Sequence, residues 1–276
     1  MNALANAKVG VCSWSLEPRG PEDLAEKVGK VGVRHIQLAL DPIRAGGWGL
    51  APTKRALDAA GIGIVSGMMA MKGEDYTTLQ TIERTGGVLL DEHWQENLAA
   101  AHANAAIAAE LGLPMITFHA GILPHEKKDP RRKLVFDRVR AVAQCFEGRG
   151  IAVALETGQE TAATLLGALE ELPRLGVNFD AANMILYGKG DPAEAVKTLA
   201  RKIVQFHVKD AIPTKIPGTW GTEVPQGTGA VGWPKFLALV RSLGLVRDFL
   251  IERESGHDRV GDIVNARILV EKALAK

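Results

Sequence analysis

Acidic or imidazole side chains stand at the ends of four successive apolar segments in the second half of the chain. IAVALE ends at Glu156, NFD ends at Asp180, FHVKD carries His207, and FLIERE carries Glu252. Carboxylates beside a protein core are costly unless they are paired or hold a metal ion. Two glutamates, one aspartate and one histidine form an oxygen and nitrogen donor set that suits Mn²⁺, Mg²⁺, Co²⁺ or Zn²⁺. We therefore predict one divalent metal ion, held by these four residues.

Each of these residues alone has a simpler interpretation. An acidic residue after a strand more often caps a helix or pairs with a cation, and a histidine in an apolar strand is commonly a hydrogen-bonded core residue. The metal interpretation is favoured because the residues end consecutive apolar runs. Glu252 directly follows its apolar run, so we assign it as the ligand and place Glu254 behind it or in the loop.

A regular series of strands and helices is needed to position these side chains. Short apolar runs, typical of buried strands, occur at Val9–Trp14, His35–Leu40, Ile62–Met69, Met115–His119, Ile151–Glu156, Val177–Asp180, Ile203–Val208 and Asp248–Ile251. Stretches with helical spacing between and after them include Glu22–Val31, Trp94–Leu111, Arg131–Glu147, Pro192–Arg201, Trp233–Leu243 and Arg259–Leu274. Glycines that suit the position after a helix precede several strands, at Gly61, Gly112, Gly150 and Gly176.

Eight strands alternating with helices over about 250 residues predict an α/β fold, the (β/α)₈ TIM barrel. We expect a single domain over residues 1–276, because no linker or composition break divides the chain. A doubly wound open sheet shares the alternation and is the alternative. In a closed barrel the carboxyl ends of the strands converge on one mouth. Two longer insertions, Gly73–Asp91 and Ala211–Gly232, would leave from this mouth.

Composition narrows the class of protein. The 276 residues are 46% hydrophobic and carry a formal net charge of +1, which gives no electrostatic reason to expect nucleic acid or membrane as a partner. Two cysteines, Cys12 and Cys145, are too few for a disulfide framework. The start MNALANAKVG lacks an apolar signal core, and no apolar run approaches the roughly 20 residues of a membrane span. We expect a soluble cytoplasmic protein and leave its assembly into a homo-oligomer open.

The motifs ITFHAG, ALETGQE, NFDAANM, FHVKDA and IERE follow one another at the ends of successive strands. In these motifs the chain resembles the xylose isomerase-like barrel superfamily, in the sugar phosphate isomerase/epimerase group, over nearly its whole length. That group includes ketose 3-epimerases, hydroxypyruvate isomerase and inosose dehydratase, with the apurinic endonucleases more distant. The resemblance implies that Glu156, Asp180, His207 and Glu252 bind Mn²⁺ or a similar ion, and that the two glutamates also move protons.

Asn183 departs from the pattern of the ketose epimerases. Those enzymes carry a histidine three residues after the metal-binding aspartate, where it contacts substrate oxygens. Asparagine can still hydrogen-bond a hydroxyl or a carbonyl, but it cannot carry a proton or a charge. We therefore expect Asn183 to bind substrate without assuming ketohexose epimerisation.

Other residues at the mouth are candidates for substrate contacts. His119 ends the fourth strand in FHAG, where a substrate hydrogen bond competes with a capping role, and Trp14 ends the first strand. Cys12 fits core packing better. Lys209 points to the same side of its strand as His207, so it either neutralises an anionic group of the substrate or pairs with a neighbouring carboxylate.

The glycine-rich insertion PGTWGTEVPQGTGAVGW contributes Trp220 and Glu223. Glycines let backbone approach a ligand closely, and an aromatic ring can cover the apolar face of a sugar. We therefore expect this segment to contact the substrate. Gln159 could also orient the substrate, whereas Glu160 fits better as the cap of the following helix.

These features predict a metal-dependent sugar isomerase or epimerase that acts on a small polyhydroxy carbonyl compound. Glu156 and Glu252 would remove and return a proton through a metal-bound enediolate. An inosose-type dehydratase and a non-catalytic sugar- or metal-binding barrel are the alternatives. An apurinic endonuclease is disfavoured, because the third apolar run offers no additional histidine and the net charge is near neutral.

Overall fold

Parallel strands close into a barrel in the computed structural model of this protein, which describes residues 7–275. In hydrogen-bonded order the strands are β1 (Val9–Cys12), β10 (Asp248–Ile251), β7 (Ile203–Val208), β6 (Gly176–Asp180), β5 (Ala152–Glu156), β4 (Met115–Phe118), β3 (Gly63–Met68) and β2 (His35–Ala39). Strand β1 pairs in parallel with both β10 and β2, which closes the ring. The predicted TIM barrel is confirmed, and the open doubly wound sheet is excluded.

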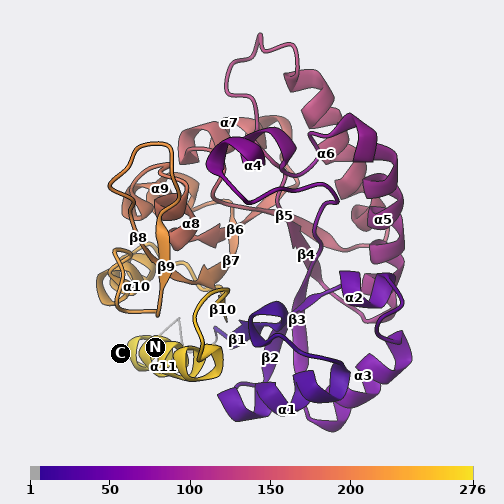
Figure 1. The fold of residues 1–276 in the computed structure, drawn as a ribbon, viewed down its shortest axis with the longest axis vertical. Helices are drawn as coiled ribbons and strands as arrows, with labels where there is room; N and C mark the ends of the chain where they lie inside the picture. The colour runs from indigo at the N-terminus through magenta and orange to yellow at the C-terminus, as the bar shows by residue number, and fades with distance from the viewer. Residues whose placement is uncertain (1–6, 276) are drawn as a thin grey trace.

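Helices surround the barrel (Figure 1). They are α1 (Pro21–Val31), α2 (Asp41–Arg44), α3 (Leu50–Ala59), α4 (Leu79–Thr85), α5 (Asp91–Glu110), α6 (Arg132–Glu147), α7 (Ala162–Glu171), α8 (Ala181–Leu186), α9 (Pro192–Leu199), α10 (Trp233–Ser242) and α11 (Arg259–Leu274). Gly112 and Gly150 follow α5 and α6 with positive φ, as predicted, whereas Gly176 is the first residue of β6. Among residues 7–275, no helix is both long enough and apolar enough to cross a membrane.

The alternation of side chains along β6 explains how a buried strand carries polar groups. Phe179 packs outward against Phe206 of β7 and Phe236 of α10, with ring centroids 6.0 Å apart in both pairs. Because successive side chains of a strand point to opposite faces, Asn178 and Asp180 on either side of Phe179 face the barrel interior. Packing of the outer face thus fixes which residues reach the interior.

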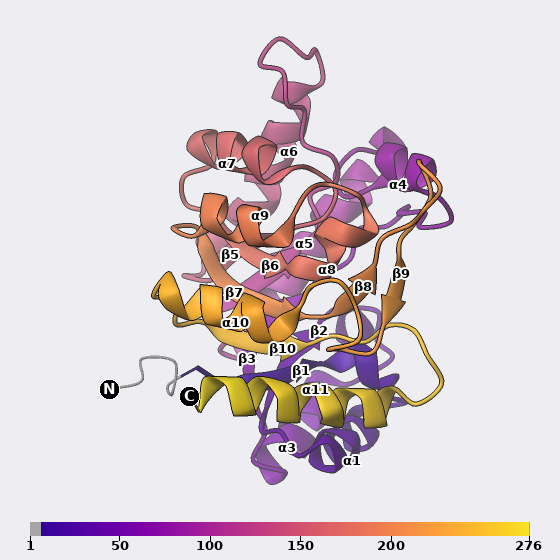
Figure 2. The ribbon, with the colours of Figure 1, turned by 90° about the vertical axis from the view of Figure 1, so that its left-hand side faces the viewer.

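Short elements build the rim at the carboxyl ends of the strands. Helix α4 lies in the predicted insertion after β3, and the antiparallel hairpin of β8 (Asp210–Ile212) and β9 (Thr222–Val224) lies largely in the insertion after β7. Figure 2 shows α4 and β9 on the same, right-hand side of the barrel. Residues Ser13–Leu16 form a 3₁₀ turn, η2, so Trp14 lies just beyond β1 and not within it. The predicted first strand is therefore two residues too long.

Candidate active site

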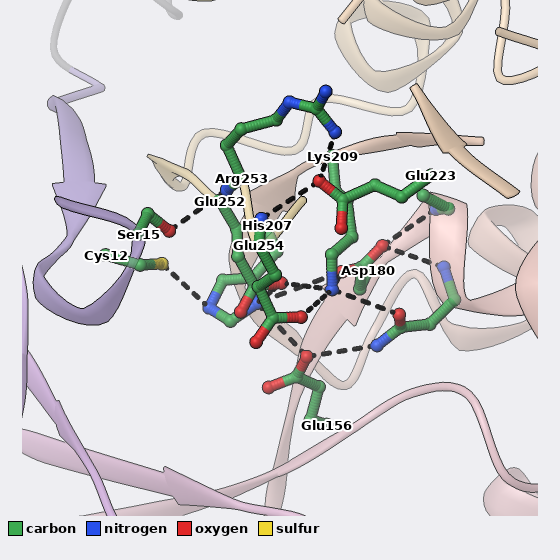
Figure 3. Close-up of polar contacts among 12 residues, drawn as sticks. Cys12, Ser15, Glu156, Asp180, His207, Lys209, Glu223, Glu252, Arg253 and Glu254 are labelled. Atoms are coloured by element: carbon green, nitrogen blue, oxygen red, sulfur yellow. Dashed lines mark hydrogen bonds and ion pairs between the residues drawn. The ribbon is translucent and has the colours of Figure 1, made fainter. Parts of the chain in front are cut away.

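The four residues predicted as metal ligands meet at the mouth of the barrel (Figure 3). One ligand atom from each of Glu156, Asp180, His207 and Glu252 lies within 4.8 Å of the others. Glu156 and Asp180 end β5 and β6, His207 lies in β7, and Glu252 directly follows β10. All four side chains are buried. Neighbouring strands therefore deliver this donor set to one place.

The orientation of the His207 ring is fixed by polar side chains inside the barrel. Its Nε2 lies 2.6 Å from Oε1 of Gln37, and the amide nitrogen of Gln37 donates to Thr117 Oγ1 at 2.8 Å. Nε2 also lies 2.9 Å from Nδ2 of Asn178, so two amides hold the ring, and the shorter contact with the carbonyl oxygen of Gln37 favours a proton on Nε2. Nδ1 lies 3.1 Å from Oε1 of Glu156 and 3.4 Å from Oε2 of Glu252; burial disfavours a charged ring, but the neighbouring acidic groups outweigh it and hold the pKa of His207 well above its ordinary value. Either a proton on Nδ1 or a metal ion in its place must therefore stand between the imidazole and the two carboxylates.

Asp180 divides its two carboxylate oxygens between the fold and the site. Oδ1 caps α8 by accepting hydrogen bonds from the backbone nitrogens of Ala182 and Asn183, at 2.7 and 2.9 Å. Oδ2 is buried and has no hydrogen-bond partner among the described residues; Lys209 Nζ lies 3.8 Å away. Burial raises the pKa of Asp180 to about 8, and the Lys209 ammonium opposes this rise. Such an unsatisfied oxygen is costly unless a ligand completes it.

These observations fit a divalent cation. The donor set contains no thiolate and matches hard or borderline metals. One ligand atom from each of the three carboxyl groups and from His207 gathers around one point, and the unbonded Oδ2 of Asp180 lies 4.0 Å from Nδ1 of His207. We treat Glu156, Asp180, His207 and Glu252 as the residues that would hold the ion.

Lys209 lies among carboxylates at the edge of this cluster. Its Nζ is 2.8 Å from both Glu252 Oε2 and Glu254 Oε2. Burial favours the neutral amine, but these carboxylates outweigh it and hold the pKa of Lys209 well above its ordinary value. Lys209 therefore pairs with carboxylates and also lines the cavity described below. Glu254 contacts the cluster through this lysine.

Glu156 is held by neutral donors. Asn183 Nδ2 donates to Glu156 Oε1 at 3.1 Å and to the carbonyl oxygen of Thr157 at 3.2 Å. Asn178 Nδ2 donates to the other carboxylate oxygen at 3.3 Å. His119 Nε2 lies 3.7 Å from Glu156 Oε1. The structure thus brings both Asn183 and His119 to the carboxylate, where each also lines the cavity.

Glu252 is positioned by residues far away in the sequence. Trp14 Nε1 donates to its Oε1 at 2.8 Å, from the turn after β1. Gln226 Nε2 donates to the backbone carbonyls of Val208 and Glu252, at 3.0 and 2.7 Å, and so links the ends of β7 and β10. Trp14 therefore lies at the mouth, as predicted, and its indole hydrogen-bonds Glu252, one of the candidate metal ligands.

A cavity of about 500 Å³ opens above the cluster, and we call it the main cavity. Its walls include Trp14, His119, Asn183, Lys209, Trp220, Glu223, Tyr187, Tyr76 and Glu74, besides Glu156 and Glu252. Trp220 packs edge-on against Tyr187 with centroids 4.6 Å apart. Glu223 Oε1 accepts from Arg253 Nη1 at 2.7 Å and from the backbone nitrogen of Glu254 at 2.9 Å, so it also fastens the hairpin to the end of β10.

Sequence reasoning missed several residues of this site. Gln37 and Asn178 are polar residues inside apolar strands, and their place on the interior face is a signal that the alternation offered. Glu74 accepts from the backbone nitrogen of Gly87 at 2.9 Å, and burial raises its pKa. Neither Glu74 nor Tyr187 ends a strand, so the strand-end argument could not find them.

The predicted capping role of Glu160 is wrong. The cap of α7 is Thr161, which accepts from the backbone nitrogen of Thr164.

Comparison with known proteins agrees with this architecture. Residues 22–268 match the family described as xylose isomerase-like TIM barrel. A xylose isomerase domain protein from Planctomyces limnophilus is 32% identical; the match covers 90% of this chain and 91% of that one, with a TM-score of 0.84. A xylose isomerase-like TIM barrel protein from Mycobacterium smegmatis, solved in complex with magnesium, is 18% identical over 99% of this chain and 98% of that one, with a TM-score of 0.75.

More distant likenesses carry less information. The uncharacterized protein YihM of Escherichia coli is 30% identical over 121 residues, which are 42% of this chain and 36% of that protein, so only about a third of this curated relative is matched. Solved structures with the same fold include a D-psicose 3-epimerase (15% identical, 98% and 100% covered, TM-score 0.70). Another is the probable 3-DHS dehydratase AsbF of Bacillus anthracis, which is 17% identical; the match covers 96% of this chain and 98% of that one, with a TM-score of 0.73. At these identities the likeness shows the fold alone.

The match over residues 22–268, together with the closed parallel barrel, shows that this chain belongs to the family of xylose isomerase-like TIM barrels.

Proposed function

We propose that this protein is a metal-dependent sugar isomerase or epimerase that acts on a small polyhydroxy carbonyl compound. One observation carries the proposal: two buried carboxylates approach the same imidazole nitrogen from strands that are not neighbours. Glu156 ends β5, Glu252 follows β10, and β6 and β7 lie between those strands. Both glutamates line the main cavity. Two carboxylates in one cavity suit a reaction in which a proton is removed from one face of a carbon and returned to the other.

The residues named above would hold Mn²⁺, Mg²⁺, Co²⁺ or Zn²⁺. When bound, such an ion polarises a carbonyl oxygen and makes the neighbouring C–H more acidic. The magnesium complex of the family member from Mycobacterium smegmatis supports a divalent ion in this kind of barrel.

The protein's own groups supply the proton transfers. One glutamate removes a proton from the carbon next to the carbonyl, which leaves an enediolate, and a proton returned to the neighbouring carbon or to the other face gives the product. Lys209 stays protonated and donates a hydrogen bond to a substrate oxygen. Asn183 supplies a neutral donor next to Glu156. Tyr187, Trp14 and Trp220 form apolar walls that exclude water from the intermediate.

Dehydration is the second candidate, and Lys209 favours it. Its ammonium group lies at the cavity wall beside Glu252 and Glu254. After the same proton removal, this ammonium group can hydrogen-bond the oxygen of a hydroxyl group that leaves as water, while the glutamate that took the proton returns it to that oxygen. The fold-level likeness to a probable dehydratase is compatible with this reaction.

Solvent deuterium separates these reactions. The metal-loaded protein is incubated with ketoses, inososes and hydroxy-keto acids in D₂O, and products are analysed by NMR and mass spectrometry. We expect deuterium on the carbon next to the carbonyl, and a fall in rate of about 10² or more in Glu156→Gln and in Glu252→Gln. Glu126→Gln, on an 82% exposed side chain, is the control.

Each outcome has a distinct meaning. Isomeric product with solvent label supports the proposal, and loss of water supports the dehydratase. Ligand binding without turnover would identify a non-catalytic barrel. Unlabelled product, or full activity in both glutamine variants, would contradict the assigned proton transfers.

A further inference from the structure

A second cavity lies beside the main one, and we call it the side cavity. It measures about 390 Å³ and lies between α4 and the loop before β9. Gln80 Nε2 of α4 donates to the carbonyl oxygen of Gly218 at 3.1 Å and so joins its two sides. Tyr187 lines both cavities, and its ring packs against Trp220 of the main cavity. A molecule bound at the candidate metal centre could therefore extend past Tyr187.

The side cavity is lined by neutral hydrogen-bonding groups alternating with apolar ones. Gln80, Gln159, Thr214 and Thr219 contribute amides and hydroxyls, and Ile122 is among its apolar residues. Gln159 is 4% exposed. Neither polar atom of its amide makes a hydrogen bond of normal geometry with the described residues, although the Tyr187 hydroxyl lies nearby. A buried amide that has only the Tyr187 hydroxyl nearby leaves hydrogen-bonding capacity unused, which is costly, so its retention points to a ligand that completes it.

The charges around the side cavity argue against a phosphate group. Lys189 is the one cationic side chain in its lining, and Glu83 is also part of that lining. Glu160 lies close enough to interact with Lys189; burial raises the pKa of this carboxyl to about 8, and Lys189 opposes the rise. A phosphate dianion is usually bound by several charge-assisted donors, and here a single lysine faces carboxyl groups. A neutral, hydroxyl-bearing group suits the lining better.

We propose that the side cavity binds a second, uncharged sugar unit, so that the substrate is a glycosylated sugar and not a free or phosphorylated monosaccharide. The reacting unit occupies the main cavity, the second unit lies between α4 and residues 214–219, and Tyr187 contacts both. This inference rests on the proposed function, because it assumes that the reacting sugar binds at Glu156 and Glu252. It also gives Gln159 a hydrogen-bonding role.

Binding measurements test the side cavity without requiring turnover. Calorimetry on the metal-loaded protein compares D-fructose, D-fructose 6-phosphate, and the glucosyl-fructoses turanose, leucrose and isomaltulose, which keep a ketose unit unsubstituted at its carbonyl. We expect at least one glucosyl-fructose to bind about tenfold or more tightly than fructose, and the phosphate to gain nothing.

Two variants localise the effect. Ile122→Trp fills the side cavity and should abolish the advantage of the glucosyl-fructose while leaving fructose binding unchanged; Ile122→Val is the matched control. Gln159→Leu should weaken the binding of the glucosyl-fructose about tenfold, yet leave the melting temperature of the free protein unchanged or higher, because a buried amide with unused hydrogen-bonding capacity is removed. This second variant keeps the test informative if Ile122→Trp folds poorly.

The outcomes are distinguishable from those of the proposed function. Equal binding of fructose and every glucosyl-fructose, no binding by any glucosyl-fructose, or a preference for the phosphate would overturn the inference. Turnover of fructose with solvent label would in that case leave the proposed isomerase standing. Tight binding of a glucosyl-fructose that both variants weaken, without any turnover, would support the side cavity and contradict the catalytic proposal.

Discussion

Two layers of polar side chains lie inside the barrel, and they satisfy their hydrogen bonds differently. The lower layer consists of Gln37, Ser66, Thr117, Asn178 and Gln205, all at most 1% exposed. Ser66 donates to Gln205, Gln205 to Asn178, and Gln37 to Thr117, at 2.7 to 3.1 Å. Every polar side-chain atom of this layer has a partner, so the layer is stable without a ligand.

The upper layer is the cluster of Glu156, Asp180, His207 and Glu252. It is equally buried but charged, and Asp180 Oδ2 has no hydrogen-bond partner among residues 7–275. His207 belongs to both layers, because its Nε2 contacts Gln37 and its Nδ1 faces the carboxylates. The two layers are similarly buried but differ in how completely their polar atoms are hydrogen-bonded, so burial alone does not define a site. A complete network forms a platform, whereas an incomplete one above it is prepared for a ligand.

The largest expected effect comes from Asp180→Asn in the upper layer. Asparagine keeps an oxygen to cap α8 but removes the charge, so we expect metal affinity to fall about 100-fold or more, beyond the 10–100-fold typical of supporting residues. Thermal unfolding of the metal-free protein should show no loss of stability. Metal titration by calorimetry and elemental analysis measure the effect, with Glu126→Gln as control. Unchanged metal content in this variant and in His207→Ala would remove the basis for the site.

A substitution in the lower layer tests the link through His207. Gln37→Leu removes the acceptor of Nε2, so we expect metal affinity to fall about 10-fold or more and the free energy of unfolding to drop by about 1–3 kcal/mol. Ser66→Ala is the matched control, because Ser66 belongs to the same layer but donates to Gln205 and not to the imidazole. It should lose stability similarly but keep metal affinity. Equal losses of metal affinity in both variants would show that the layers act through general packing.

Substitutions of Lys209 and Asn183 compare a charged with a neutral hydrogen-bond donor in the main cavity. In the proposed reaction the charged Lys209 stabilises developing negative charge, so Lys209→Ala should lower kcat about tenfold with little change in KM. Asn183 makes neutral hydrogen bonds, so Asn183→Ala should mainly raise KM. Steady-state kinetics on an identified substrate measure both. The reverse pattern would show that Lys209 serves only as an ion pair and that Asn183 contacts the transition state.

The smallest expected effect concerns a buried carboxyl outside both layers. Burial raises the pKa of Glu160 to about 8, so the folded state prefers the protonated form while the unfolded chain ionises near its ordinary pKa of about 4.3. Folding stability attributable to Glu160 is therefore present at low pH and is lost as the pH rises through 8. Glu160→Gln should stabilise the protein by at least about 1 kcal/mol at pH 8 and by less at pH 5, measured by urea unfolding. An equal gain at both pH values would contradict the raised pKa.

Much of the fold and part of the candidate site follow from sequence patterns. The barrel and the meeting of Glu156, Asp180 and His207 are predictable because apolar runs that recur along a chain, each with a polar end, are typical of parallel strands that share one mouth. The ends of the strands were less predictable. The 3₁₀ turn at Trp14 shows this, because the chain leaves β1 without a glycine or proline that would mark the end of the strand. Tyr187 could not be assigned, since its contact with Trp220 and its place in the side cavity depend on long-range packing.

Asp180 has a consequence for the evolution of this barrel. One of its oxygens belongs to the fold and the other to the site, and an asparagine or a serine can replace the first function but not the second. Under the proposed function, a single codon change can therefore remove the metal and the activity while leaving a folded protein with an intact cavity. On the same assumption, this residue is the one to inspect first when a homologous gene is to be sorted into enzymes and binders.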